Sequence, residues 1–315
     1  MAISAPTATS DFSGFVPADQ AEPIFEKAAR ISAVQQLVQR VPLGLTGTNI
    51  PVITGRPSAG WVDEGGTKPA SAGSMTLKSI TPKKLAAIMV VSAEVARLNP
   101  AQFVDRMTNS FAETFAVSFD LAALHDQGPD GSVGAGPFAT HIDQTAKAVE
   151  IGGSSQALGG IHGDFVAALD LLVSDTDASG RRYQCNGFAI DSVLEPNLWA
   201  ATTTTGAPLY TDLPTGDAAA MTQGRLLGRP AYIRDTVATA NLSTVVGYAG
   251  DWSQAAWGAI GGISYRISTE ATVTINGSLT SLWEKNLVAI LAEAEYGFIV
   301  NDTDAFVRLT NATGS

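Results

Sequence analysis

The sequence predicts an α+β fold, and three observations support this prediction. Residues 100–127 carry an apolar residue, phenylalanine in all cases but one, at every fourth position from 103 to 119, which is typical of a long amphipathic helix with one apolar face. The preceding stretch, 55–84, is polar and marked by glycine and proline. Strand-like runs such as 85–91 and 224–233 are mixed with helical ones and no internal repeat is present, so both kinds of element are expected in one fold.

The composition is that of a globular chain, 45% hydrophobic and 16% charged, and 315 residues allow one large domain or two of ordinary size. The net charge of −11 is uneven: residues 1–100 hold 9 Lys/Arg and 7 Asp/Glu, whereas residues 101–315 hold 10 and 23. A basic front and an acidic back favour head-to-tail attraction between copies. The acidic body argues against direct binding to double-stranded nucleic acid. It is compatible with a container for nucleic acid, because the wall of such a container must not bind its contents.

Cys185 is the single cysteine, which excludes a disulfide framework and a cysteine-based metal site. No apolar run approaches the length of a membrane span, and residues 1–20 lack the basic and apolar regions of a signal peptide. We therefore expect a protein that is made and kept in the cytoplasm, without membrane contact.

The elements expected before the long helix are an extended arm over 1–20, a short helix within 22–40 and a strand over 49–54. Residues 55–81, punctuated by glycine and proline, predict a two-stranded loop that stands off the body, with one limb around Trp61-Val62. Such a loop does not hold together on its own surface. An exposed Trp61 on it therefore indicates cover by another subunit.

The long helix has a start signal and a stop signal. Asn99 suits the N-cap, Pro100 the first helical position and Gln102 a capping-box partner, while Gly128 marks the end. The apolar stripe comprises Phe103, Val104, Met107, Phe111, Phe115, Phe119, Leu121 and Leu124. At about 1.5 Å per residue the helix would be roughly 40 Å long, which makes it the spine of the fold.

Several shorter elements are expected after the spine. In order, they are strand 142–151, helix 164–174, strand 188–190, helix 192–200, strands 224–233 and 244–248, a brief helix 253–258 and strand 263–275. Residues 282–300 fit both a helix and a strand, and periodicity alone does not decide between them.

The order of arm, hairpin, strand, spine helix, mixed middle and terminal strands resembles the major capsid protein of tailed bacteriophages, which has the Hong Kong 97-type fold. The strings that carry the resemblance are Gly60-Trp61-Val62-Asp63-Glu64-Gly65 with Lys68-Pro69, the stretch 85–95, Gly224-Arg225-Leu226-Leu227-Gly228-Arg229-Pro230, Gly250-Asp251-Trp252-Ser253, and Trp283-Glu284-Lys285-Asn286 to Glu293 followed by Ala305-Phe306-Val307. Their order and spacing together span nearly the whole chain.

The resemblance implies five regions: an arm and lead-in (1–54), an extended loop (55–84), a peripheral domain with the spine helix (85–150), an axial domain (151–262) and return strands of the peripheral domain (263–315). It also favours a strand over 282–300. The implied function is a major capsid protein without enzymatic turnover, cofactor or metal, which assembles as pentamers and hexamers into an icosahedral head around phage DNA.

The resemblance also implies partners and a location. Some family members carry a long helical scaffolding segment at the N-terminus, and because this chain lacks one, a separate scaffold is expected, or assembly driven by the short arm. A portal and, optionally, a decoration protein complete the set of partners. The implied location is the virion capsid, assembled in the host cytoplasm.

Two other functions fit part of the sequence. An encapsulin, the shell of a bacterial compartment with protein cargo, would share the fold, but encapsulins tend to begin with a helix, whereas residues 1–20 are rich in Pro, Gly, Ser and Thr. A cytoplasmic α+β hydrolase would need a convergent nucleophile, base and orienting carboxylate. The histidines, His125, His141 and His162, are too scattered to indicate such a set or a metal site.

The candidate contact residues lie in and beside the extended loop. Its basic side chains are placed to meet acidic groups of a neighbouring subunit, and Trp61 supplies an aromatic anchor. The alternative is a solvated basic hairpin. The predicted interface residues are Arg56, Trp61, Glu64, Lys68, Lys78, Lys83 and Lys84.

Some family members cross-link neighbouring subunits through a loop lysine and an asparagine, assisted by a glutamate. The resemblance places Asn286 and Glu293 at the latter two positions. A carboxylate in an apolar setting can take the proton of the lysine amine, which then attacks the amide. The lysine position is occupied by Leu77, so Lys78 and Lys68 are the candidates; the alternative is that Asn286 and Glu293 pair with neighbouring side chains.

Two further patterns favour structural roles. Asp175, Asp177, Ser179 and Gly180 partly resemble a calcium loop, but Asn186 stands where the bidentate glutamate belongs, so a hairpin turn is the preferred interpretation. His125 is expected in the last turn of the spine, where the helix dipole favours its charged form.

Overall fold

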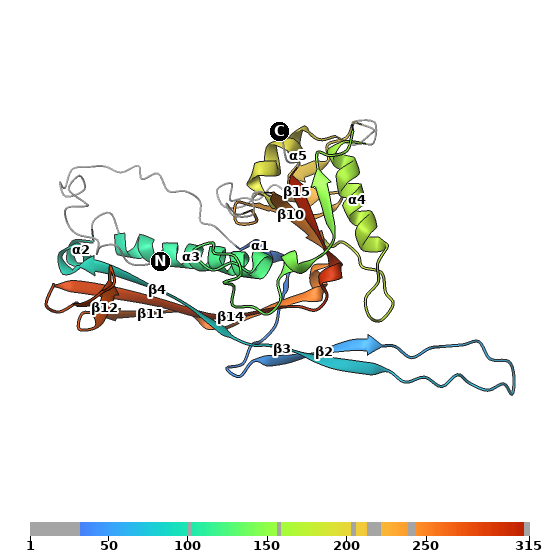
Figure 1. Ribbon diagram of the computed structural model, residues 1–315, viewed down its shortest axis with the longest axis horizontal. Helices are drawn as coiled ribbons and strands as arrows, with labels where there is room; N and C mark the ends of the chain where they lie inside the picture. Colours follow the sequence, from blue (N-terminus) through green and yellow to red (C-terminus); the bar gives the residue numbers. More distant parts are fainter. Residues whose placement is uncertain are drawn as a thin grey trace.

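The computed structural model describes residues 32–99, 103–155, 159–202, 206–212, 222–238 and 244–311. It has three parts: a long four-stranded sheet lined by one helix, a domain built around a seven-stranded sheet, and a two-stranded hairpin that projects from the region between them (Figure 1). The α+β prediction is confirmed. No helix in the described part of the chain has the length and apolar character needed to cross a bilayer.

The four-stranded sheet, which we call the peripheral sheet, has the order β1-β11-β14-β4. Its strands are β1 (Gln39–Arg40), β4 (Lys83–Ser92), β11 (Ala255–Ser268) and β14 (Leu287–Val300). β14 lies antiparallel between β11 and β4, so each neighbour supplies backbone hydrogen bonds that a helix would have made internally. The ambiguous stretch 282–300 therefore contains a strand, as the resemblance favoured.

A small hairpin of β12 (Thr272–Ile275) and β13 (Ser278–Ser281) lies at the far end of the peripheral sheet (Figure 1). The brief helix expected over 253–258 is confined to the 3-10 turn η6 (Trp252–Gln254), because β11 begins at Ala255. The other 3-10 turns are η3 (Ile142–Gln144), η5 (Ser192–Leu194) and η7 (Thr303–Ala305).

The predicted spine is helix α3 (Phe103–His125), which runs along the peripheral sheet (Figure 1). The proposed cap residues Pro100 and Gln102 lie outside the described residues. Asn99 has a role other than the expected one: it ends helix α2 (Ala93–Leu98) in the left-handed conformation, with φ 39°.

The aromatic stripe of α3 faces the sheet as predicted. Phe115 is 1% exposed and packs on Ala292 and Ala294, two alternate residues of β14 whose small side chains let the helix approach closely. Phe119 lies one turn further on and is surrounded by rings with centroids 5.4–6.1 Å away, those of Phe138, Trp257, Tyr296 and Phe298.

The seven-stranded sheet, which we call the axial sheet, has the order β5-β15-β10-β6-β9-β8-β7. Its strands are β5 (Ala148–Ile151), β6 (Gly187–Asp191), β7 (Tyr210–Asp212), β8 (Thr222–Leu226), β9 (Arg229–Arg234), β10 (Val245–Gly250) and β15 (Phe306–Asn311). Every residue of the central strands β6 and β10 is buried. Helices α4 (Ile161–Val173) and α5 (Glu195–Ala200) accompany this sheet, and the side chains of α4 join its core.

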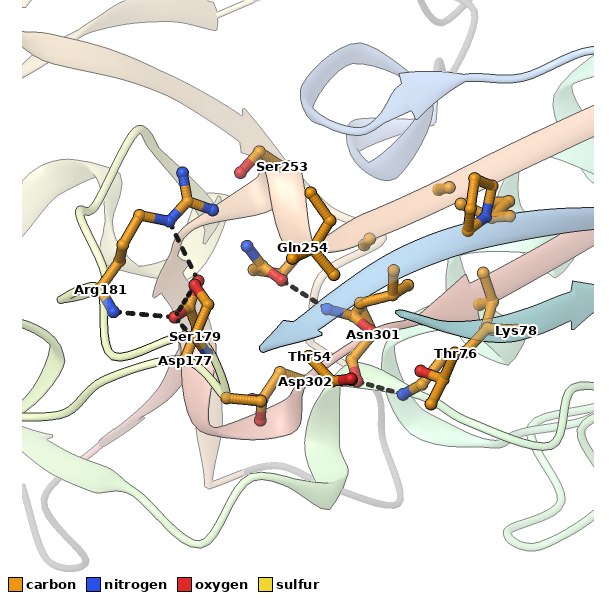
Figure 2. Close-up of a pocket in the computed structure, with 18 of the residues that line it drawn as sticks. Thr54, Thr76, Lys78, Asp177, Ser179, Arg181, Ser253, Gln254, Asn301 and Asp302 are labelled. Atoms are coloured by element: carbon orange, nitrogen blue, oxygen red, sulfur yellow. Dashed lines mark hydrogen bonds and ion pairs between the residues drawn. The ribbon is translucent and has the colours of Figure 1, made fainter. Parts of the chain in front are cut away.

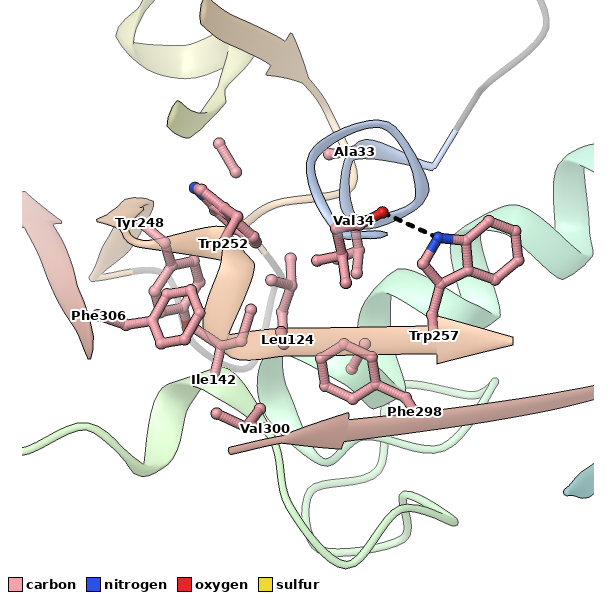
Figure 3. Packing of buried hydrophobic residues seen from close by; sticks show 14 of the residues in the cluster. Ala33, Val34, Leu124, Ile142, Tyr248, Trp252, Trp257, Phe298, Val300 and Phe306 are labelled. Atoms are coloured by element: carbon pink, nitrogen blue, oxygen red, sulfur yellow. Dashed lines mark hydrogen bonds between the residues drawn. The ribbon is translucent and has the colours of Figure 1, made fainter. Parts of the chain in front are cut away.

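A second hydrophobic cluster joins the axial sheet to the peripheral sheet and to the short helix α1 (Ala33–Leu37) (Figure 3). Trp252 packs edge-on against Phe306 at 5.3 Å, and the indole Nε1 of Trp257 donates to the carbonyl of Val38 at 3.1 Å. Both tryptophans are buried.

The projecting hairpin consists of β2 (Thr48–Gly55) and β3 (Ser74–Ile80), joined by the tip segment 56–73 (Figure 1). The prediction of a two-stranded loop is confirmed, but Trp61-Val62 does not form a paired limb. The ladder ends at Gly55 because the tip segment is rich in glycine and proline, which weaken or interrupt strand pairing.

Strand pairing places several boundaries differently from the regions implied by the resemblance. β15, assigned to the return strands 263–315, pairs with β10 and β5 in the axial sheet. β11, assigned in part to the axial region, lies wholly in the peripheral sheet. After β14 in the peripheral sheet, the chain therefore returns to the axial sheet with β15, a crossing that the five regions in linear order do not contain.

Candidate subunit-contact surfaces

The hairpin β2–β3 has an apolar face that the subunit leaves uncovered. Pro51 lies opposite Leu77 and Ile53 opposite Met75, so these residues share one face of the two-stranded sheet. Ile53, Met75 and Leu77 are 52%, 62% and 70% exposed. Because an isolated two-stranded sheet is marginally stable in water, this face is suited to burial against another molecule.

The tip segment 56–73 holds four of the predicted contact residues, Arg56, Trp61, Glu64 and Lys68, and all four are exposed. The indole of Trp61 is fully accessible to solvent. Trp61, Glu64 and Lys68 therefore lie towards the end of the hairpin, whereas Arg56 follows directly on β2 and lies nearer the body.

Lys78 lies on the opposite face of the hairpin and serves the subunit itself. Its Nζ donates to the carbonyl of Asn301, just after β14, and so ties the hairpin to the body (Figure 2). The base of the hairpin is also held sterically: a Cβ at Gly297 of β14 would lie 2.4 Å from Cγ2 of Ile80. The hairpin therefore leaves the body in a defined direction.

Lys78 also lines a groove of about 400 Å³ between the hairpin base and the turn around Asp177 (Figure 2). In this turn the carboxylate of Asp177 accepts from the backbone N–H groups of Ser179 and Arg181 at 2.9 and 2.8 Å. Although partial burial acts to raise it, these hydrogen bonds bring the pKa of Asp177 down to about 2. The partial calcium motif is thus a hairpin turn, and the described residues contain no group of three side chains placed to hold a metal.

Lys83 and Lys84 lie at the start of β4, in the peripheral sheet beside the hairpin. Lys84 Nζ donates to Glu293 Oε1 at 2.9 Å, and Arg266 lies 3.9 Å from the other oxygen of the same carboxylate. Lys83 forms no ion pair within the described part of the chain. Of the two lysines, Lys83 is therefore the one available to a neighbouring subunit.

The asparagine and the glutamate proposed for cross-linking are engaged within the subunit. The hydrogen bond from Lys84 and the nearby Arg266 hold the pKa of Glu293 below its usual range, whereas a base that accepts a lysine proton needs the opposite shift. Asn286 adopts a positive φ of 52°, and its Nδ2 donates to Glu94 Oε1 at 2.5 Å. Both groups have the neighbouring partners that the alternative interpretation predicted.

Asp120 is a buried anchor that the sequence did not reveal. Its carboxylate accepts from the hydroxyls of Ser32 and Thr236, at 2.5 and 2.8 Å, and from the backbone N–H groups of Ala33 and Val34. It thereby joins the N-terminus of α1 and the segment after β9 to the spine. Burial raises the pKa of Asp120 to about 6, against the opposing effect of these hydrogen bonds.

His125 is buried at the end of the spine, and this burial opposes the charged form expected from the helix dipole. Its Nε2 donates to the carbonyl of Val237 at 2.6 Å, and its Nδ1 lies 2.9 Å from the hydroxyl of Tyr248 on β10. Burial lowers the pKa of His125, which outweighs the helix end. The expectation was wrong because sequence position places a residue on a helix but does not show what covers it.

The comparisons with known proteins agree with this geometry. The model of the phage capsid family matches residues 13–311. The chain is 40% identical over 312 residues to the probable major capsid protein of Mycobacterium phage D29, which covers 98% of this chain and 93% of that protein. It is 39% identical over 317 residues to the corresponding protein of Mycobacterium phage L5, with 98% and 92% covered.

Solved structures show the same fold. A chain from Gordonia phage Cozz superposes with a TM-score of 0.74 at 24% identity, covering 97% of this chain and 94% of the other. The family match extends over both sheets, the spine and the hairpin. The chain therefore belongs to the phage capsid family.

Proposed function

We propose that this major capsid protein assembles as pentamers and hexamers into an icosahedral shell around double-stranded phage DNA, with a separate scaffold and a portal as partners and the host cytoplasm as the place of assembly. The uncovered apolar face of the hairpin carries the proposal. A subunit that exposes Ile53, Met75 and Leu77 on a projecting arm gains stability only when another molecule covers them.

The charge distribution supports assembly around DNA. The net charge of −11 keeps subunits from binding the duplex directly, since such binding requires a basic face that releases counterions. Contact between subunits then depends on the local basic side chains around the hairpin base, above all Lys83, rather than on the overall charge.

Electron microscopy of the purified chain, with and without a co-expressed scaffold, tests the proposal. We expect closed shells with five-fold and six-fold capsomers, and nucleic acid rather than protein cargo inside particles from infected cells. Protein cargo in place of DNA would indicate an encapsulin-type compartment, and a chain that remains monomeric under all conditions would contradict a shell function.

Charge reversal at Lys83 and Lys84 tests the contact surface. The variant Lys83→Glu/Lys84→Glu is expected to lose particles while each subunit stays folded, because both side chains lie at the surface and the loss of the Lys84–Glu293 ion pair lowers the melting temperature only slightly. Lys285→Glu is a matched control, since Lys285 is an exposed lysine just before the start of β14. Normal particles from the double variant would contradict the assignment.

We propose further that the shell is held by non-covalent contacts, because Glu293 and Asn286 are satisfied within the subunit. Denaturing electrophoresis of intact particles is then expected to release a single band at the monomer mass of 32.6 kDa. A ladder of higher masses, abolished by Asn286→Asp, would instead establish the cross-link.

A further inference from the structure

An apolar pocket of about 160 Å³ opens between α3, the start of β4 and the loop that follows α3. Three aromatic side chains, Phe119, Phe138 and Tyr296, form its walls. A cavity of about 150 Å³ with an apolar lining holds a benzene-sized ring. The pocket therefore has the size and the lining to receive the six-membered ring of one aromatic side chain.

The rim of this pocket is positively charged. Lys83 and Lys84 both line it, and only Lys84 is engaged by a carboxylate, that of Glu293. A group that enters the pocket with a carboxylate beside it would pair with Lys83, while its apolar part is covered by the aromatic walls.

The tip of the extended loop has the complementary chemistry. The fully exposed indole of Trp61 is followed by Asp63 and Glu64, both also exposed. A turn closes here, because the N–H of Gly66 donates to the carbonyl of Asp63 at 2.9 Å and Gly65 adopts a φ of 80°. The tip thus presents one large aromatic side chain and two carboxylates on a short, turned segment.

The tip does not reach the pocket of its own subunit. Gly60 lies opposite Pro69, and at about 3.3 Å per residue the tip is about 36 Å along the hairpin from its base at Ile80. The hairpin points away from α3 (Figure 1). A loop tip that enters this pocket therefore has to come from a second copy of the chain.

We infer that Trp61 of one subunit docks in the pocket between α3 and β4 of a neighbouring subunit, with Asp63 and Glu64 facing Lys83 on its rim. This inference rests on the proposed shell assembly and specifies which surfaces meet in it. Trp61 then acts as the central buried anchor of the contact, and the charges on the rim set its orientation.

Photo-cross-linking in assembled particles tests the inference directly. Trp61 is replaced by benzoylphenylalanine, particles are irradiated, and the joined peptides are identified by mass spectrometry. We expect cross-links between subunits, from position 61 to peptides that contain Leu85, Ser118–Ala122 or Ala135–Phe138. Normal particles whose cross-links fall elsewhere overturn the pocket and leave the shell function intact, whereas an unsubstituted chain that forms no particles overturns both.

A pair of matched variants provides an independent test. Ala135 lines the pocket and is exposed, so Ala135→Trp fills the pocket from its rim without disturbing the core. Ala139 is exposed on the same loop but does not line the pocket. Ala135→Trp and Trp61→Ala are both expected to reduce the particle yield by about tenfold or more at an unchanged melting temperature, and Ala139→Trp to leave it unchanged. Equal yields from Ala135→Trp and Ala139→Trp would overturn the inference.

Discussion

The hairpin and the axial sheet are both built from short β-strands with apolar residues, yet their surroundings are opposite. Every residue of β6 and β10 is buried between layers of the same subunit. On the hairpin, Leu77 and Met75 remain mostly exposed, and the tip has no regular structure. The comparison indicates that the axial sheet stabilises the single subunit, whereas the hairpin gains its stability from contacts made during assembly.

The two regions also differ in how they join the spine. The axial side is joined through buried polar groups, Asp120 and His125, whose hydrogen bonds reach α1, β10 and the segments after β9. The hairpin is joined through its base alone, where Ile80 packs on Gly297 and Lys78 reaches Asn301. Changes on the axial side should therefore alter folding, and changes on the hairpin should alter assembly.

The largest effect is expected in the axial core. Phe188 is fully buried and stacks edge-on against Phe165, with ring centroids 5.7 Å apart. Phe188→Ala should lower the free energy of unfolding by about 3–5 kcal/mol, because it removes buried apolar surface and leaves a cavity. Urea unfolding of unassembled subunits measures this change. A loss as small as that from a surface substitution would show that the axial sheet is not the stabilising part.

The next effect concerns pH and the Asp120 anchor. Because the native pKa is about 6 and that of the unfolded chain about 3.9, the native subunit keeps a proton between these pH values that the unfolded chain has released. This contribution to stability is complete below pH 4 and is lost as the pH rises through 6, a change of about 3 kcal/mol. As the pH rises from 4 to above 6, the free energy of unfolding of the native chain should fall relative to that of Asp120→Asn, which does not titrate. A difference between the two chains that stays constant over this range would contradict the shifted pKa.

A smaller effect is expected from the cap of α1. The hydroxyl of Ser32 accepts from the N–H of Gln35 and donates to Asp120. Ser32→Ala should cost about 1–2 kcal/mol in the free energy of unfolding, the usual range for the loss of an N-cap. Ser32→Thr keeps the hydroxyl and should recover most of the stability, which separates the cap from a general effect of substitution at this position.

The smallest effect on folding is expected on the hairpin. Leu77→Ala should change the free energy of unfolding of the subunit by less than about 0.5 kcal/mol, since the side chain is 70% exposed. The same variant should reduce particle yield, measured by sedimentation. A clear loss of subunit stability, with assembly unaffected, would reverse the division of roles between hairpin and axial sheet.

Much of the fold was predictable because it follows from local patterns. The spacing of Phe111, Phe115 and Phe119 predicted the spine and the face it buries, and glycine and proline marked the projecting loop. The sequence indicated that an exposed Trp61 would need cover from another subunit, since a two-stranded hairpin has no second layer to cover a large side chain, and the indole is indeed fully exposed in the single subunit.

The site was predicted less completely because contacts between distant residues decide it. Lys78 was assigned to a neighbour but reaches Asn301 of its own chain, and Glu293 is held by Lys84. Neither pairing has a signature in sequence spacing. In the sequence, Asp120 is noticeable only as a charged residue among the apolar residues of the spine. Its neighbours in the sequence do not show that its carboxylate accepts hydrogen bonds from the first N–H groups of α1.

The sequence by itself determined the elements whose pattern repeats over several turns or alternates over a strand: the long helix, the hairpin and the apolar faces that they carry. Only the tertiary structure decided that 287–300 is an inner strand of a sheet, that β15 crosses to the axial sheet, and that burial lowers the pKa of His125. The physical reason is the same in each case. A strand obtains its hydrogen bonds, and a buried side chain its environment, from segments that are distant in the sequence, whereas a helix makes its hydrogen bonds within itself.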